Sequence, residues 1–331
     1  MTSPPAIARR TLLLAAAGLC VASRPAFAGD VLRIGSQTTG TFAWQLDVIR
    51  RHKLAERAGL DLKITNYASP DAGKLALNAG SVDLAVVDWL WVARSRALGA
   101  RLLFYPYSSA AGAVMVKPDS PLRGIGDLKG NVLAVAGGPL DKSWLIVQAA
   151  ALRDGIDLKR DATLQYGAPP LIFEKARQSD AGASLNFWNF CARLDTLGYR
   201  RLLDVRDAQV ALGLKEPVAL IGYVFNEEFA ARQKSVIDRF IAVTQQANEI
   251  LANSDEEWVA LRPLMQAEDD ATFRQYRDRT REGMSRRSVA DEARDAGALF
   301  ATLAELGGPD LVGPARQLDG ALYYQSSGRG D

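Results

Sequence analysis

Short apolar runs alternate with amphipathic stretches along the first third of the chain. The apolar runs predict buried strands at Val31–Gly35, Leu62–Tyr67, Val82–Val87 and Arg101–Tyr105. The amphipathic stretches predict helices at Thr41–His52, Ala72–Ala79 and Trp89–Leu98. Strands and helices that alternate with short connections are typical of a parallel sheet covered by helices.

A second unit of the same kind follows the strand Val114–Val116 and the turn-rich segment Lys117–Pro121. Its strands are expected at Val132–Ala136, Thr163–Tyr166, Gly182–Leu185 and Arg201–Val205, and its helices at Ser143–Arg153 and Leu171–Arg177. The apolar strand Val218–Phe225 is expected to lead the chain back to the first unit. After it, apolar residues recur at helical spacing, so the remainder is expected to be helical.

The N-terminus has the pattern of an export signal. Arg9 and Arg10 precede the apolar run Thr11–Ala22, and Ala26 and Ala28 are small residues placed for cleavage. The run is too short to cross a bilayer comfortably. We therefore expect a signal peptide over residues 1–28 that is removed on export, by either the Sec or the twin-arginine route.

The charge balance argues against nucleic acid as a partner. The 331 residues include 40 Lys and Arg and 38 Asp and Glu. Cleavage after Ala28 removes three arginines and no acid, which leaves 37 basic against 38 acidic residues. A nucleic-acid-binding domain is expected to carry a basic surplus. Only Cys191 remains in the cleaved chain, so we expect no internal disulfide. We also expect the protein to be a monomer.

The order of these elements, with three segments, resembles a known family. Ser36–Gly40 follows the first strand, Asp83–Asp88 contains the third, and Ser120–Gly130 ends in Asp-Leu-Lys-Gly before the next strand. This resembles the nitrate/sulfonate/taurine substrate-binding family of ATP-driven importers, which includes relatives of the thiamine-pyrimidine precursor binders. The likeness runs from about Val31 to about Leu251.

The resemblance implies a type II periplasmic binding fold of two α/β lobes, joined by two crossover strands near Val116–Pro118 and Ile221–Val224. Lobe I would comprise residues 29–117 and 222–331, with the C-terminal helical extension, and lobe II residues 118–221. Such a protein works in the periplasm and passes a small-molecule ligand to the permease of an ABC importer in the inner membrane. Two segments depart from the family pattern, Trp89–Trp91 and Ser184–Asn189. Both lie where ligand is expected, so the ligand's identity stays open.

In open α/β sheets, ligands bind beyond the carboxyl ends of the strands. The candidate ligand-binding residues at these ends are Gln37, Thr38, Thr39, Tyr67, Asp88 and Trp89 in the first unit, and Gly137, Gly138, Ser143, Trp144, Asn186, Trp188 and Asn189 in the second. Helix N-termini favour oxyanions. Lys142 adds positive charge to the second unit, and Asp141 partly offsets it.

Several of these residues have a structural alternative. Thr38 and Thr39 are suited to cap the following helix, and capping and ligand contact are equally good interpretations of Asp88. Trp91 is expected to pack between elements, whereas Trp144 and Trp188 are expected to face the cleft. The hypothesis is a ligand with an anionic head and an apolar or aromatic body, held by closure of the lobes.

The sequence argues against an enzyme. The single histidine, His52, lies at the end of the first helix, and Cys191 is expected to pack as a small apolar side chain. Motifs of serine hydrolases, P-loop proteins and zinc sites are absent, and so is the cysteine-rich segment of the related thiamine-pyrimidine synthases. We expect no cofactor and no metal. The remaining alternative is a binding protein that acts as a sensor or as an assembly partner of a redox enzyme.

Overall fold

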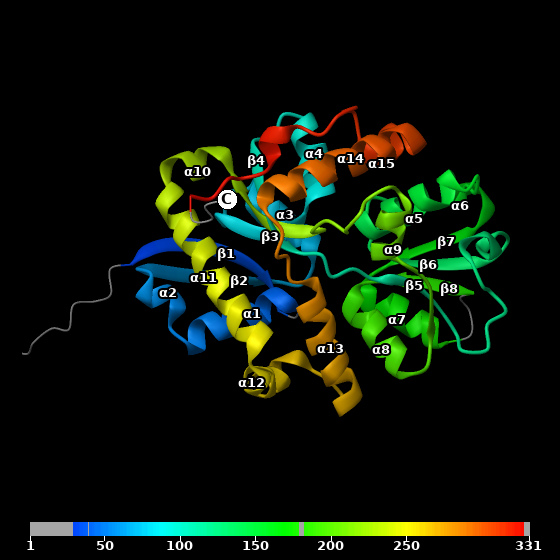
Figure 1. The fold of residues 1–331 in the computed structure, drawn as a ribbon, viewed down its shortest axis with the longest axis horizontal. Coiled ribbons are helices and arrows are strands. Elements are labelled where there is room, and N and C mark those ends of the chain that lie inside the picture. The colour runs from blue at the N-terminus through cyan, green and yellow to red at the C-terminus, as the bar shows by residue number, and fades with distance from the viewer. Residues whose placement is uncertain (1–28, 39, 179–181, 328–331) are drawn as a thin grey trace, which may run out of the picture.

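The computed structural model describes residues 29–38, 40–178 and 182–327. The expected signal peptide, residues 1–28, and Thr39 lie outside the described residues. Two five-stranded sheets, each with helices on its faces, lie side by side (Figure 1). We call the first sheet with its helices lobe I and the second with its helices lobe II.

The sheet of lobe I has the strand order β2-β1-β3-β10-β4. Its strands are β1 (Asp30–Gln37), β2 (Leu60–Tyr67), β3 (Leu84–Asp88), β4 (Leu102–Ser108) and β10 (Ile221–Asn226). Strands β1, β2 and β3 run parallel, as the sequence pattern predicts, whereas β10 pairs antiparallel with β3 and β4. The sheet is therefore mixed, because β10 enters lobe I from the side of lobe II and runs opposite to its neighbours.

The sheet of lobe II repeats this arrangement with the order β7-β6-β8-β5-β9. Its strands are β5 (Ala113–Val116), β6 (Val132–Ala136), β7 (Thr163–Gly167), β8 (Ala183–Asn186) and β9 (Arg200–Asp204). Here β5 is the strand that arrives from the other lobe, and it pairs antiparallel with β8 and β9.

The helices fall into three groups. In lobe I they are α1 (Thr41–Arg51), α2 (Leu54–Arg57), α3 (Pro70–Asn78) and α4 (Trp89–Ala97). In lobe II they are α5 (Lys142–Arg153), α6 (Leu158–Asp161), α7 (Pro169–Arg177), α8 (Trp188–Thr196) and α9 (Val205–Ala211), with a 3-10 turn at Ile125–Leu128. The C-terminal extension has α10 (Glu227–Arg232), α11 (Lys234–Asn253), α12 (Asp255–Met265), α13 (Asp270–Gly283), α14 (Val289–Gly307), α15 (Pro309–Val312) and a 3-10 turn at Gly320–Leu322.

The long C-terminal helices are amphipathic, as their apolar spacing predicts. Val236, Phe240 and Val243 of α11 are buried, and so are Phe300 and Leu303 of α14. Each helix buries one stripe of apolar side chains against the lobes, and the removal of that surface from water stabilises the fold.

Two short segments cross between the lobes, one between β4 and β5 and one between β9 and β10. Because β5 pairs only within the second sheet in the pairings of the described residues, we propose that the first crossing lies at residues 109–112, shortly before the boundary of 117 expected from the sequence. We propose likewise that the return crossing lies just before Ile221, the first residue of β10, near the expected boundary of 221.

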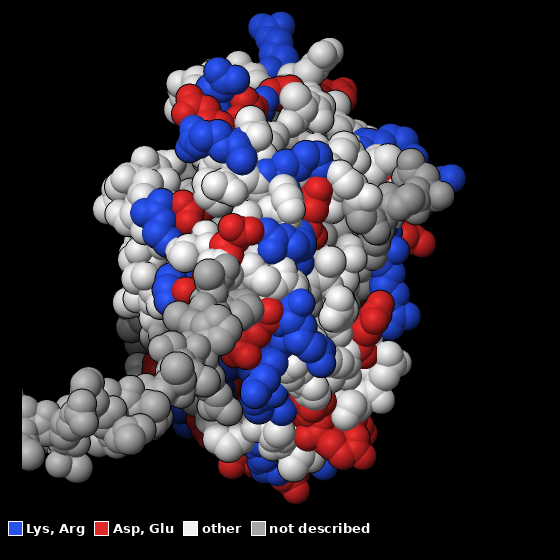
Figure 2. Space-filling view, turned by 90° about the vertical axis from the view of Figure 1, so that its left-hand side faces the viewer, with Lys and Arg blue, Asp and Glu red and all other residues white. Residues whose placement is uncertain are grey.

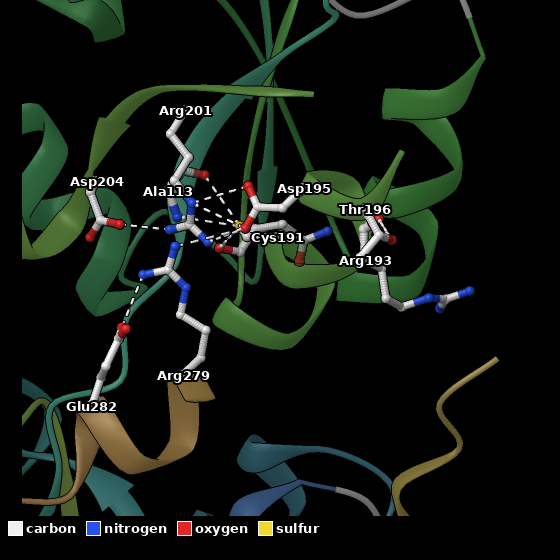
Figure 3. A network of polar contacts seen from close by, with 10 residues as sticks. Ala113, Cys191, Arg193, Asp195, Thr196, Arg201, Asp204, Arg279 and Glu282 are labelled. Atoms are coloured by element: carbon white, nitrogen blue, oxygen red, sulfur yellow. Dashed lines mark hydrogen bonds and ion pairs between the residues drawn. The ribbon is translucent and has the colours of Figure 1, made fainter. Parts of the chain in front are cut away.

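Helix α13 of the extension packs on helix α8 of lobe II (Figure 1). In the network drawn in Figure 3, Arg201 of β9 donates to Asp195 of α8, with Nη2 to Oδ2 at 2.7 Å, and Arg279 of α13 approaches the same carboxylate oxygen at 4.0 Å. Figure 2 shows basic and acidic side chains interspersed over one face. Within the described residues, no helix has the length and apolarity needed to cross a membrane.

Candidate functional site

A cavity of about 380 Å³ lies where the helix starts of both lobes meet. Lobe I contributes the starts of α1, α3 and α4, and lobe II contributes the starts of α5, α7 and α8. The first crossing, Ala110–Gly112, and Ile221 of β10 complete the lining. This volume lies within the range of small-molecule sites, and such sites are expected at the carboxyl ends of the strands.

The helix starts differ in what satisfies their N–H groups. Asp88 caps α4 by accepting a hydrogen bond from the Trp91 N–H at 2.7 Å, and Asp141 caps α5 by accepting from the Ser143 N–H at 2.9 Å. The cap residues of α1 and α8 are Gly40 and Phe187, and neither cap has a side-chain hydrogen bond. The first N–H groups of α1 and α8 are therefore donors suited to an oxyanion.

Two lysine side chains line the cavity, one from each lobe. Lys74 of α3 has its Nζ 3.7 Å from Asp88 Oδ2, and Lys142 of α5 has its Nζ 3.5 Å from Asp141 Oδ2. Each acid thus caps a helix with one oxygen and faces a lysine with the other. Both lysine side chains are largely buried, with 21% and 16% of their surface exposed.

The walls of the cavity are mainly aromatic and apolar. Phe42 and Tyr67 line it from lobe I, and Phe187, Trp188 and Phe190 line it from lobe II. Trp188 also packs edge-on against Trp44 of α1, with the ring centroids 5.9 Å apart, so the two lobes touch through aromatic rings beside the cavity. The arrangement suits a ligand with a charged head and an apolar body.

The structure brings about half of the candidate residues to this cavity. Those that line it are Gln37, Tyr67, Asp88, Ser143, Trp188 and Asn189. The structure shows the helix-capping role for Asp88, one of the two interpretations left open by the sequence. Ligand contact by all six stays a prediction.

The other candidates lie elsewhere among the described residues. Trp89 and Trp144 are fully buried inside the lobes, where they pack against Phe300 and Tyr166. Each follows a capping position closely, and its side chain points back into the core rather than out of the helix start. Neither tryptophan is in the lining of the cavity.

Asn186 is also fully buried, and its role is to order two helix starts. Its side-chain amide donates to the Pro169 carbonyl at 3.0 Å, and its Oδ1 accepts from the Phe187 N–H at 2.8 Å. Gly137 donates to the Gly167 carbonyl at 2.8 Å. Three further candidates are absent from the described lining of the cavity: Gly137, Gly138, which lies in a turn, and the exposed Thr38.

Sequence reasoning overlooked several lining residues. Lys74 lies one helical turn after Pro70, so the cap at Ser69 together with helical spacing would have pointed to it. Phe187 is the cap of α8, a helix that the sequence pattern did not reveal. Residues 110–112 belong to a crossing, and no local pattern in the sequence places them beside a ligand.

His52 and Cys191 do not form a catalytic pair in the described structure. The ring Nε2 of His52 lies 2.7 Å from Oε1 of Glu257 on α12. The Cys191 Sγ is buried against the Ala113 N–H, and burial raises the pKa of this thiol to about 12. The sulfur therefore stays in its thiol form at neutral pH, and the thiolate is the nucleophilic form.

Comparison with known proteins identifies the family. A family model described as NMT1/THI5 like matches residues 56–257, which is more than half of the chain. The chain belongs to this family. The expected relation to the nitrate/sulfonate/taurine-type binding proteins is confirmed, because the named relatives of this chain are sulfonate-binding proteins.

One curated relative comes from Escherichia coli (strain K12) and is named "Putative aliphatic sulfonates-binding protein". It is 31% identical over 147 residues, which cover 42% of this chain and 45% of the relative. The alignment thus spans less than half the length of that protein. Its name, like those of the structural relatives, is that of a binding protein, in agreement with the expectation that the chain is not an enzyme.

Two solved structures have the same fold. The alkanesulfonate-binding protein SsuA of Xanthomonas axonopodis pv. citri, bound to MOPS, superposes with a TM-score of 0.69 at 20% identity over 89% of this chain and 98% of its own. The periplasmic aliphatic sulphonate binding protein SsuA of Escherichia coli gives a TM-score of 0.70 at 20% identity over 87% and 95%. The type II periplasmic binding fold expected from the sequence is confirmed.

Proposed function

We propose that the chain is the ligand-binding component of an ABC importer. It binds a small organic anion, a sulfonate, carboxylate or related heteroaromatic, in the cavity between its lobes. It works in the periplasm, after export by a cleaved signal peptide, and delivers the anion to the permease in the inner membrane.

The observation that carries this proposal is the cavity itself. Uncapped helix starts and the largely buried Lys142 supply positive potential, and aromatic side chains supply an apolar wall for the rest of the molecule. An anion with an apolar body matches both features. The names of the relatives support a sulfonate as the first class to test.

Closure of the lobes gives the mechanism. The lining comes from both lobes, so a ligand in the cavity touches both and binds the closed form better than the open form. Its differential affinity shifts the population toward closure, and closure excludes water from the polar contacts. The permease then distinguishes the closed shape from the open one.

Calorimetric titration of the exported chain with butanesulfonate, MOPS and benzoate tests the proposal. We expect saturable binding of at least one anion, together with a smaller radius of gyration by solution scattering. Replacing the wall residue, Trp188→Leu, should weaken binding about tenfold, which is about 1.4 kcal/mol. Leu75→Ala, at a side chain that is 71% exposed outside the cavity lining, is the matched control. Absence of binding and of compaction with every anion would contradict the proposal.

A further inference from the structure

We propose that the negatively charged head of the ligand binds on the lobe II side of the cavity, at Lys142 and Ser143 of α5. The apolar body then lies toward Phe42 and Tyr67 of lobe I. This assignment rests on the proposed function. It gives the ligand an orientation, and it identifies Lys142 as the residue that makes the site prefer an anion.

Lys142 keeps donors for an anion. Its only ion pair among the described residues is with Asp141, at 3.5 Å, whereas a strong N–H···O bond between charged groups measures about 2.7–2.9 Å. The other oxygen of Asp141 is used in the cap of α5. An ammonium group has three N–H donors, so Lys142 has donors left that its neighbours do not satisfy.

Ser143 gives independent evidence for a ligand oxygen at this place. The residue is 3% exposed and lines the cavity, yet its hydroxyl takes part in none of the hydrogen bonds found in the described parts of the chain. The hydroxyl therefore keeps its donor and acceptor capacity for a partner in the cavity. An oxygen of a bound sulfonate or carboxylate would supply that partner.

The start of α8 lies beside these two residues. The Lys142 Nζ is 4.7 Å from the centroid of the Phe187 ring, and Phe187 is the cap residue of α8. Trp188 and Asn189 follow it and line the cavity, so their backbone N–H groups add donors on the same side. Three kinds of donor, an ammonium, a hydroxyl and helix-start N–H groups, thus gather in lobe II.

Lobe I also offers an anion the uncapped start of α1, but its lysine is less available than Lys142. Lys74 lies 3.2 Å from Asp71 Oδ1 and 3.7 Å from Asp88 Oδ2, so two carboxylates share one ammonium. The negative charge of these two acids outweighs the positive charge of Lys74 and opposes the binding of the ligand's anionic head. Phe42, which is 6% exposed, provides instead an apolar surface for the ligand's body.

The experiment compares Lys142→Gln with the matched Lys74→Gln in the full exported chain. The probes are butanesulfonate and the uncharged butanesulfonamide, measured by calorimetry. Lys142→Gln should weaken butanesulfonate binding more than tenfold, about 1.4 kcal/mol, and leave butanesulfonamide binding unchanged. Lys74→Gln should weaken butanesulfonate less than threefold. Ser143→Ala should weaken it several-fold. Circular dichroism and thermal unfolding confirm that each variant is folded.

The outcomes separate this assignment from the proposed function. If the wild-type chain binds butanesulfonate and Lys142→Gln binds it equally well, the assignment is wrong and the proposed function stands. If Lys74→Gln loses more affinity than Lys142→Gln, the head lies in lobe I and the assignment is again wrong. If the wild-type chain binds neither butanesulfonate nor any other anion tested above, both proposals are wrong.

Discussion

Gly112, in the first crossing between the lobes, permits a contact that no other residue allows. A Cβ atom built at this position would lie 1.7 Å from the carbonyl oxygen of Asn186 and 2.8 Å from its carbonyl carbon. Both of these atoms belong to the backbone, so the clash cannot be relieved by the movement of a flexible side chain. The glycine therefore lets the crossing approach the end of β8, which leads into the α8 start at the cavity.

We expect Gly112→Ala to lower the free energy of unfolding by about 3 kcal/mol, because the added methyl group forces the backbone apart. Gly138→Ala is the matched control. A Cβ at Gly138 meets nothing within 4 Å, and its φ angle lies outside the left-handed region, so its effect should stay within about 0.5 kcal/mol. Urea unfolding of both variants checks this, and equal stabilities would show that the close approach is absent.

Helix α13 connects the two lobes at the level of whole elements. It packs on α8 of lobe II, and its Tyr276 ring lies 5.6 Å from the ring of Trp188 and 5.8 Å from that of Trp44 in lobe I. The preceding helix, α12, holds lobe I through contacts with α1. The C-terminal extension thus adds a third link beside the two crossings (Figure 1).

Tyr276→Ala should loosen this link, because it removes a buried ring from between two tryptophans of different lobes. We expect a loss of about 3 kcal/mol in unfolding free energy and faster hydrogen exchange in α13 and α8. Arg274→Ala, at an exposed position of the same helix, is the control and should change neither. Unchanged exchange in α8 would mean that α13 does not restrain lobe II.

Across the whole molecule, both crossings are hydrogen-bonded to the C-terminal extension. The Ser109 N–H donates to the Gly283 carbonyl at 2.8 Å, and the Ala219 N–H donates to Glu292 Oε2 at 2.8 Å. Glu292, on α14, is 1% exposed, and its Oε1 accepts from the Ser285 hydroxyl at 2.9 Å. Burial raises the pKa of Glu292, while its hydrogen bonds and the nearby Arg287 act in the opposite direction.

The raised pKa predicts a pH dependence of stability. As pH rises through and above the ordinary pKa of a glutamic acid, Glu292 loses its proton first in the unfolded chain, so the folded state is progressively disfavoured. The unfolding free energy of the wild-type chain, relative to Glu292→Gln, should therefore fall as pH rises above that pKa. Denaturant unfolding at a series of pH values measures it. A relative stability that rises with pH would show that the carboxylate is better stabilised in the folded protein than outside it.

Hydrophobic patterning alone determined much of this protein. The strands, most longer helices of both lobes and the amphipathic α11 and α14 could be predicted, because apolar period and short connections are local properties of the chain. The family relation came instead from the resemblance of three sequence segments and the order of the elements. The family relation also predicted the cleft between two lobes, and the strand-end rule predicted that Gln37, Asp88 and Ser143 lie near it.

Only the tertiary structure decided what local patterns do not encode. It placed the side chains of Trp89 and Trp144 in the cores of the lobes and not in the cavity, because the direction of a side chain near a helix start depends on how that helix packs. It made both sheets mixed, because β5 and β10 each cross from the other lobe. It also placed Lys74, Lys142 and residues 110–112 around one cavity, since residues distant in the chain meet only when both lobes have folded and the crossings have fixed their distance.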